Sequence, residues 1–217
     1  MASFNMRNIK LIIFDLAGTL VDAYPAIIQS FNYTMRKLDY PRQDNLIIRR
    51  AVGWGDDSLL EPFINSKDLK KAVSIYRGHH KTALLKKSSL FPRVDKVLTY
   101  LKDKGYKLAV ASNRPTKFSW IIIRHLKLEK YFVYILCADK LKRRKPHPEI
   151  LHKIMQRLSV KPCQALYVGD MTIDAQAGRR AQIKTIIVTT GSSRSAEIKK
   201  ERPCRIIARI TDLLKFL

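Results

Sequence analysis

The stretch LIIFDLAGTLVD, residues 11–22, is the most informative part of the sequence, because a strand pattern in it leads directly into candidate catalytic residues. Four apolar residues precede Asp15, a Gly-Thr turn follows, and a second acid stands at Asp22. This pattern predicts a buried strand that delivers one carboxylate to a sheet edge and then turns sharply. Ala17 stands two residues past that carboxylate, where a catalytic loop would more usefully carry a second acid. The stretch therefore leaves open a working active site, an altered one, or only a strand and a turn.

The composition is that of a globular protein with a substantial core. The chain has 217 residues, of which 46% are hydrophobic, enough for one large domain or a core domain with a smaller insertion. Its three cysteines are scattered without a CxxC pair, which favours a reducing compartment and argues against a zinc site. Charged residues interrupt the Ile- and Tyr-rich stretch 118–140, so we expect no membrane-spanning helix and a cytoplasmic location.

The charge balance is the most unusual bulk property. There are 42 Lys and Arg residues against 18 Asp and Glu, a formal net charge of +24. The basic residues are spread along the chain, and the densest run, KLKRRK at 140–145, has no aromatic residues interleaved with it. We therefore expect a solvated basic surface that attracts a small anionic substrate, with nucleic acid or another polyanion as the alternative partner.

Strand-like segments alternate with helical patterns along most of the chain. The expected strands cover residues 11–16, 107–112, 131–136, 165–170 and 184–190, and apolar spacing predicts helices over 94–101 and 147–158. Apolar strands that alternate with helices indicate an α/β fold with a parallel sheet covered on both faces. Ligands bind beyond the carboxyl ends of such strands, and Asp15, Ser112 and Asp170 each stand at or just past such an end.

Residues 23–87 break this alternation. Apolar residues keep helical spacing over 27–38 and again over 69–76, and no convincing strand lies between them. We therefore expect an all-helical insert that forms a lid over the ligand-binding edge of the sheet.

Four separated elements carry the candidate chemistry. They are Asp15 in DLAGTLVD, Ser112 and Asn113 in VASN, Lys145 in RKPHPE, and Asp170 and Asp174 in GDMTID. In this order on alternating strands and helices, they resemble the haloacid dehalogenase-like hydrolase superfamily. The cap stretch AVGWGDDSLL, residues 51–60, looks most like the phosphoglycolate phosphatase branch, in which a Gly-containing loop faces the active site.

The resemblance implies a Rossmann-like doubly wound core with a helical cap inserted after the first strand. Residues 1–22 and 88–217 would form the core, and residues 23–87 the cap. The cofactor would be Mg²⁺, since two carboxylates and a phosphate oxygen make a site of hard oxygen ligands. The partner would be a small phosphorylated metabolite, and the protein would be a monomer or a dimer.

The resemblance also assigns roles at the metal and the nucleophile. A carboxylate can attack phosphorus and form an aspartyl-phosphate, the role expected of Asp15. Asp15 and Asp170 would bind the metal by their side chains, and Ala17 by its backbone carbonyl. Asp174 would complete the expected metal site of Asp15, Ala17, Asp170 and Asp174, where it would orient metal-bound water or the lysine. Alternatively, it would complement the dipole at a helix N-terminus.

A further group of residues is expected to bind the substrate. Ser112 and the backbone at Asn113 would hold the phosphate oxygens that are not transferred, and Lys145 would neutralise charge on the nucleophile and the phosphoryl group. Trp54 would close over the substrate, or else pack within the cap. The full expected set is Gly18, Thr19, Gly53, Trp54, Ser112, Asn113 and Lys145.

The identity of residue 17, an alanine, bears on which activity is expected. In most phosphatases of this superfamily its position holds an aspartate that protonates the departing alcohol and then activates water. Such acid–base groups contribute roughly 10² to 10⁴-fold to the rate. The chain is therefore expected to be a Mg²⁺-dependent phosphatase for small phosphomonoesters such as phosphoglycolate, slow or narrow in its substrates.

Two alternatives remain open. Phosphonoacetaldehyde hydrolase, which cleaves a carbon–phosphorus bond, resembles this chain at DLAGT, but it needs a cap lysine that forms a Schiff base. None of the cap lysines here has the apolar surroundings of a lysine with a lowered pKa. The other alternative is a catalytically degenerate phosphate-binding module. Dehalogenase activity is least favoured, because Asp170 and Asp174 keep a metal site that such chemistry does not use.

Overall fold

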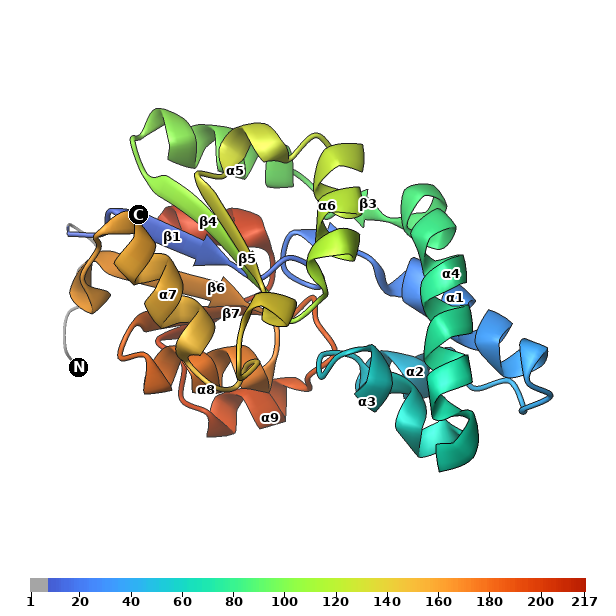
Figure 1. The fold of residues 1–217 in the computed structure, drawn as a ribbon. Coiled ribbons are helices and arrows are strands. Elements are labelled where there is room, and N and C mark those ends of the chain that lie inside the picture. Colours follow the sequence, from blue (N-terminus) through green and yellow to red (C-terminus); the bar gives the residue numbers. More distant parts are fainter. Residues whose placement is uncertain (1–7) are drawn as a thin grey trace.

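A six-stranded parallel sheet forms the centre of the molecule, whose computed structural model describes residues 8–217 (Figure 1). The sheet order is β5-β4-β1-β6-β7-β8, and every neighbouring pair is parallel. The strands are β1 (Leu11–Phe14), β4 (Lys107–Ser112), β5 (Tyr134–Cys137), β6 (Ala165–Gly169), β7 (Lys184–Val188) and β8 (Arg205–Ile207). The expected parallel α/β sheet is confirmed.

Helices cover both faces of this sheet, because successive strand residues point to opposite sides. Ile12 and Phe14 pack with α5 (Val94–Asp103) and α6 (Thr116–His125) on one face. Leu11 and Ile13 pack with α7 (Glu149–Leu158) and α8 (Thr172–Arg180) on the other. Beyond α8, the short α9 (Ser195–Lys200) packs Ile198 against β7. Short 3₁₀ segments cover Glu61–Phe63, Ser66–Asp68, Glu129–Tyr131, Ala138–Lys140, Pro162–Gln164 and Ile210–Lys215.

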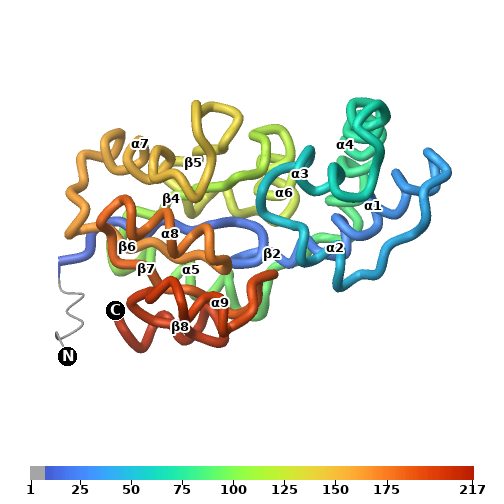
Figure 2. The backbone as a smooth tube through the Cα atoms, turned by 90° about the horizontal axis from the view of Figure 1, so that it is seen from below, coloured from blue at the N-terminus to red at the C-terminus, as the bar shows by residue number. Residues whose placement is uncertain are grey.

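A second group of helices lies beyond the carboxyl ends of the strands (Figure 2). These are α1 (Tyr24–Lys37), α2 (Asn45–Ala51), α3 (Asp56–Leu60) and α4 (Leu69–Lys87). The chain enters and leaves the group through the antiparallel pair β2 (Val21–Asp22) and β3 (Ser89–Leu90). The group contains no strand, as the helical spacing over 27–38 and 69–76 predicted. Within residues 8–217, no helix combines the length and apolarity that crossing a membrane requires.

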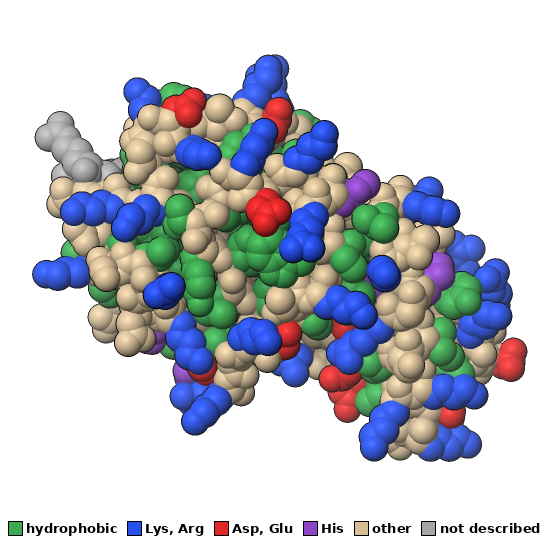
Figure 3. Space-filling view, turned by 45° about the horizontal axis from the view of Figure 1, so that its top comes forward, with side chains coloured by type: hydrophobic (Ala, Val, Ile, Leu, Met, Phe, Trp, Pro, Cys, Tyr) green, Lys and Arg blue, Asp and Glu red, His purple; other side chains and the backbone are tan. Residues whose placement is uncertain are grey.

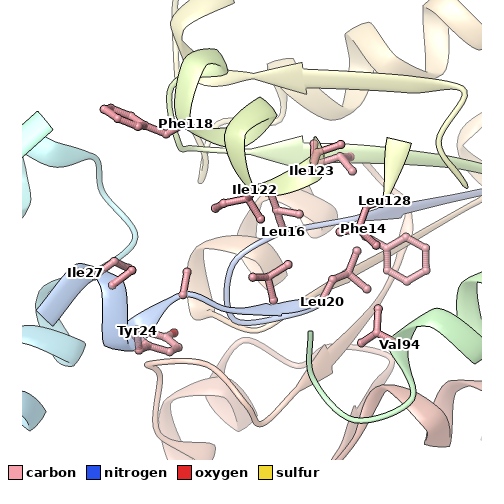
Figure 4. Close-up of a cluster of buried hydrophobic side chains, with 14 of the residues drawn as sticks. Phe14, Leu16, Leu20, Tyr24, Ile27, Val94, Phe118, Ile122, Ile123 and Leu128 are labelled. Carbon is pink, nitrogen blue, oxygen red and sulfur yellow. The ribbon is translucent and has the colours of Figure 1, made fainter. Parts of the chain in front are cut away.

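One apolar cluster joins the sheet to the base of the cap (Figure 4). Side chains from β1 and the following turn meet side chains from α1 and α6 there. The labelled members are Phe14, Leu16, Leu20, Tyr24, Ile27, Val94, Phe118, Ile122, Ile123 and Leu128. Because α1 shares this cluster with the sheet, the turn that carries Asp15 is anchored from both sides.

Several boundaries differ from the expected ones for identifiable reasons. The strand expected at 131–136 begins at Tyr134, because residues 129–131 form a 3₁₀ turn. The helix expected from residue 147 begins at Glu149, because Pro148 disfavours helical backbone at the residue before it. The expected strands 11–16, 165–170 and 184–190 end at Phe14, Gly169 and Val188. Each of these three strands therefore stops before the acidic or polar residue that follows it.

Candidate functional site

The site lies where the chain changes direction in the sheet. In chain order, β4 and β5 are added to the sheet on one side of β1. The next strands, β6, β7 and β8, are added on the other side of β1. Phe14 is level with Val110 of β4 and Val168 of β6, and the backbone N–H of Asp15 donates to Val168 at 2.8 Å. Such a switch point is where ligands bind in open α/β sheets. Asp15 is thereby fixed at this edge.

Lys145 is the centre of a buried hydrogen-bond cluster. Its ammonium group donates to Asp15 Oδ1 at 2.7 Å, Asp174 Oδ1 at 2.8 Å, the Tyr167 hydroxyl at 2.9 Å and the Ala111 carbonyl at 3.0 Å. Burial alone lowers the pKa of Lys145, but the two carboxylates outweigh burial and raise it above its usual value. The lysine is therefore a fixed positive charge beside Asp15.

Asp174 holds this lysine in position. One of its carboxylate oxygens accepts hydrogen bonds from Lys145 and, at 2.6 Å, from the Tyr167 hydroxyl. The other accepts from the backbone N–H groups of Asp170 at 3.1 Å and Met171 at 3.0 Å. The geometry matches two of the functions expected for Asp174: it orients the lysine, and it is also an acid in the first turn of α8 that accepts from the backbone N–H of Met171 at the start of that helix.

Asp170 has an acceptor oxygen without a protein partner. Its Oδ1 accepts from the Thr19 hydroxyl at 2.9 Å, whereas its buried Oδ2 has no hydrogen-bond partner among the described residues. Gly18 and Gly191 close in on this carboxylate, and a Cβ atom at either position would collide with Oδ2. Burial raises the pKa of Asp170 well above its usual value, and the nearby Asp15 raises it further. A positive charge would therefore be favourable here.

The donors at this place suit a hard divalent cation. Burial also raises the pKa of Asp15 to about 6, with Lys145 opposing the shift. In the described part of the chain, no three His, Cys, Asp or Glu side chains form a metal-binding group. Two carboxylates completed by a backbone carbonyl, water and a phosphate oxygen would still fit Mg²⁺, which rarely uses an all-protein cage. Asp15, Asp170 and the Ala17 carbonyl are the candidate ligands.

A cavity opens between this edge of the sheet and the cap. It encloses about 600 Å³, part of it open solvent. Asp15, Ala17, Ser112, Asn113, Lys145 and Asp174 line it from the core side, and Gly53 lines it from the cap. The structure thus brings these expected residues together, with Gly18, Thr19 and Asp170 packed behind them.

Trp54 lies apart from the other expected residues. Its side chain is 44% exposed and does not line the cavity. The loop that carries it is nevertheless held to the core. The Asn113 side-chain amide donates to the Gly53 carbonyl at 3.0 Å and to the Lys145 carbonyl at 3.1 Å, and Arg144 donates to the Trp54 carbonyl. Asn113 therefore links the cap loop to the backbone of the buried lysine.

Two residues of the site were not anticipated. Tyr167 stands in β6, where a hydroxyl inside a run of aliphatic residues was the available signal. Arg114 follows Ser112 and Asn113 directly, lines the cavity, and donates its backbone N–H to the Ser112 hydroxyl at 3.1 Å. Its position next to an expected phosphate-binding pair was the signal that would have identified it.

Comparisons with known proteins place this geometry in context. A family model described as haloacid dehalogenase-like hydrolase matches residues 12–188. A phosphoglycolate phosphatase of Aquifex aeolicus is 32% identical over 96% of this chain and 96% of its own length. One from Colwellia psychrerythraea is 31% identical over 91% of this chain and 92% of its own.

Solved structures agree with these sequence matches. The crystal structure of a predicted phosphoglycolate phosphatase from Haemophilus somnus has a TM-score of 0.91 at 27% identity, covering 97% of this chain and 99% of that one. A predicted phosphatase from Clostridium acetobutylicum has a TM-score of 0.85 at 27% identity, covering 95% and 97%. The similarity in both sequence and structure spans the core and the cap helices.

Proposed function

The chain belongs to the haloacid dehalogenase-like hydrolase family, and on that premise we propose that it is a Mg²⁺-dependent phosphatase for small phosphomonoesters such as phosphoglycolate. Membership makes it a hydrolase, and relatives that carry a phosphatase name match nearly its whole length. One observation supports the finer proposal most directly. The fully buried Lys145 holds one oxygen of Asp15 at 2.7 Å at the floor of the cavity.

The residues of the site suggest how the reaction would proceed. Because Lys145 holds Oδ1 of Asp15, the other carboxylate oxygen is the one available to attack phosphorus. A bond from that oxygen to phosphorus forms as the bond to the ester oxygen breaks, and water then hydrolyses the aspartyl-phosphate to release phosphate. Ser112 and the backbone at Asn113 would hold the phosphate oxygens. Mg²⁺ bound by Asp15, Asp170 and the Ala17 carbonyl would supply charge neutralisation at the phosphoryl group.

Ala17 limits which esters can react. It lines the cavity but offers no proton to a leaving alkoxide. We therefore propose slow or narrow activity, best on esters whose leaving group needs no proton. Cleavage of a carbon–phosphorus bond through a cap lysine is less well supported, because Lys145, from the core, is the one lysine that lines the described cavity.

Several finer assignments belong to the same proposal. We assign residues 1–22 and 88–217 to a core domain and residues 23–87 to a cap domain. The pairing of β2 with β3, which closes the cap off from the sheet, supports this division. The partner would be a small phosphorylated metabolite, met in the cytoplasm by a monomer or dimer.

Phosphate release with Mg²⁺ tests the proposal. Wild type and Asp15→Asn would be compared on 2-phosphoglycolate and on an aryl phosphate, with a metal chelator as a further arm. We expect chelator-sensitive release by wild type, at least from the aryl ester, and none by Asp15→Asn. Asp95→Asn is the matched control, because Asp95 is an exposed acid on α5 outside the cavity lining. Full activity of Asp15→Asn would rule out the aspartyl-phosphate. Silence of wild type on both esters would favour a phosphate-binding module instead.

A further inference from the structure

Arg114 is a cation in the cavity lining that forms no ion pair with any described carboxylate, although its charge acts on nearby Asp15 and opposes the burial that raises the pKa of that carboxyl. The lining contains Lys145 as well, but that lysine is paired with Asp15 and Asp174. Asp56, an acid of the cap in the same lining, is paired instead with Arg77 on α4, at 2.8 Å. Within residues 8–217, Arg114 takes part in no ion pair. The cavity therefore presents one positive charge that remains available to a ligand.

A neutral partner holds the guanidinium group of Arg114 in place. Its Nη1 donates to His80 Nε2 at 2.7 Å, and His80 is fully buried on α4, stacked on Tyr76 at 4.8 Å between ring centres. Burial, together with the charge of Arg114, lowers the pKa of His80 to about 2. The imidazole is therefore uncharged, with Nε2 as an acceptor and Nδ1 as a donor to the Ser30 hydroxyl at 3.1 Å. His80 orients the arginine and leaves its charge uncompensated.

The guanidinium group of Arg114 also has N–H donors that are not used by any described residue. The bond to His80 is the one side-chain hydrogen bond that Arg114 makes among the described residues, and its buried Nε–H has no partner. A guanidinium carries five N–H donors in a planar fork that matches a carboxylate. Unused donors on a fixed cation favour an anionic ligand.

We propose that Arg114 binds a second anionic group of the substrate, a carboxylate, so that the preferred substrates are short phosphomonoesters of carboxylic acids. This proposal rests on the proposed phosphatase function and adds the residue that selects among phosphomonoesters. Arg114 follows Ser112 and Asn113 directly and lines the same cavity, so one small substrate can contact both the expected phosphate site and the arginine. Ile27 and Leu59 line the same cavity from the cap, and such apolar walls suit a short organic link between the two groups.

Comparing the binding of two probes distinguishes the proposed role of Arg114 from the proposed phosphatase function. An Asp15→Asn background prevents turnover, and calorimetric titration in Mg²⁺ would measure the dissociation constants of 2-phosphoglycolate and of inorganic phosphate. Adding Arg114→Met should weaken phosphoglycolate binding about 10- to 100-fold, the range expected for lost hydrogen bonds between charged groups. Phosphate binding should change by less than about threefold, since phosphate lacks the carboxylate.

Two further variants complete the design. Arg114→Lys keeps the charge without the fork and should lose part of the selectivity; it also decides the question if Arg114→Met fails to fold. Lys117→Met removes an exposed charge three residues further on and should leave both affinities unchanged. Equal weakening of the two probes by Arg114→Met, or no weakening of phosphoglycolate, would overturn the role of Arg114. Failure of the wild-type protein to bind inorganic phosphate in Mg²⁺ would contradict the phosphatase function itself.

Discussion

At the scale of single residues, Ala17 is the position that we propose limits the reactivity of this site. It lines the cavity two residues from Asp15, so a longer side chain there would reach the same space. Ala17→Asp should raise turnover of 2-phosphoglycolate about 10²- to 10⁴-fold, because it restores a proton donor for the leaving alkoxide. An aryl phosphate should gain much less, since its leaving group needs little protonation. Phosphate release by both proteins on both esters measures the difference.

Ala17→Asn is the control for this change, because it adds the same bulk without a transferable proton. The interpretation of Ala17 as a missing acid is wrong if Ala17→Asp leaves the rate on phosphoglycolate unaltered while the aryl ester is hydrolysed. A similar increase in turnover in Ala17→Asn would instead show that the added bulk, and not a proton donor, is responsible.

His80 makes the stability of the fold depend on pH. Its pKa is lowered to about 2 in the folded protein by burial, with Arg114 adding to the shift, whereas an unfolded histidine titrates near 6.5. Below pH 6.5 the unfolded chain binds a proton that the folded chain does not, so the free energy of unfolding falls as pH falls. Between pH 7.5 and 5.5 this single group should cost about 1.4 kcal/mol.

Urea unfolding at the two pH values measures this cost, with His80→Gln as the comparison. The variant keeps a polar side chain beside Arg114 but cannot take up the proton. We expect wild type to lose about 1.4 kcal/mol more than His80→Gln between pH 7.5 and 5.5. Equal losses in the two proteins would show that His80 is protonated in the folded state.

At the scale of secondary-structure elements, the turn after β1 shapes the proposed metal site. Gly18 has φ +97°, and a Cβ there would collide with Asp170 Oδ2. Gly18→Ala should therefore displace the carboxylate and raise the Mg²⁺ concentration for half-maximal activity by about tenfold or more, as when a supporting contact of a metal site is lost. Titration of phosphate release with Mg²⁺ provides the measurement.

Gly105→Ala is a matched control for that variant. Gly105 also has a positive φ, +84°, but an added Cβ there would meet no atom within 4 Å among residues 8–217, its chain neighbours aside. Both variants strain the backbone, because L-residues rarely adopt such angles, and only Gly18→Ala also disturbs a carboxylate. An equal change in Mg²⁺ dependence for the two would mean that backbone strain alone is responsible.

The elements also show how far the sequence alone predicts this fold. The strand expected at 107–112 coincides with β4, because an unbroken apolar run is a strong signal. By contrast, α6 was not predicted, since Phe118–Ile123 is as apolar as a strand and becomes helical in packing against the sheet and α4. β8 was not predicted either, because three residues at a sheet edge are too short to show a period.

In the candidate site, too, some contacts could be predicted from the sequence and others could not. Asp15, Ser112 and Asp170 could be placed together because each is the last residue of a parallel strand or the residue directly after one, and the carboxyl ends of these strands meet at one edge of the sheet. The contact of Arg114 with His80 joins the loop after β4 to α4, between residues 34 positions apart, and no local pattern encodes it. Such contacts depend on how the cap docks, which a single sequence does not reveal.

At the scale of the whole molecule, the net charge of +24 acts on the approach of substrate. Lys and Arg side chains are spread over both the core and the cap on the face shown in Figure 3, with few acidic ones between them. A phosphorylated carboxylic acid is strongly anionic, so this field should raise its local concentration at the cavity and strengthen its binding. Salt screens the field, since the Debye length falls from about 30 Å at 0.01 M to about 8 Å at 0.15 M. We therefore expect kcat/KM for 2-phosphoglycolate to fall severalfold over that range, with kcat little changed.

Charge-reversed variants distinguish local steering from a general salt effect. Lys140 and Lys142 are exposed in the run that leads to Lys145, whereas Lys104 and Lys161 are exposed just before β4 and β6, at the opposite edge of the sheet. Lys140→Glu with Lys142→Glu should lower kcat/KM at 0.01 M salt and flatten its salt dependence. Lys104→Glu with Lys161→Glu changes the net charge by the same amount. This pair should have a much smaller effect on kcat/KM and on its salt dependence, because a charge beyond a Debye length from the cavity is screened. Equal effects of the two pairs would show that total charge, rather than its position near the cavity, governs the attraction of substrate.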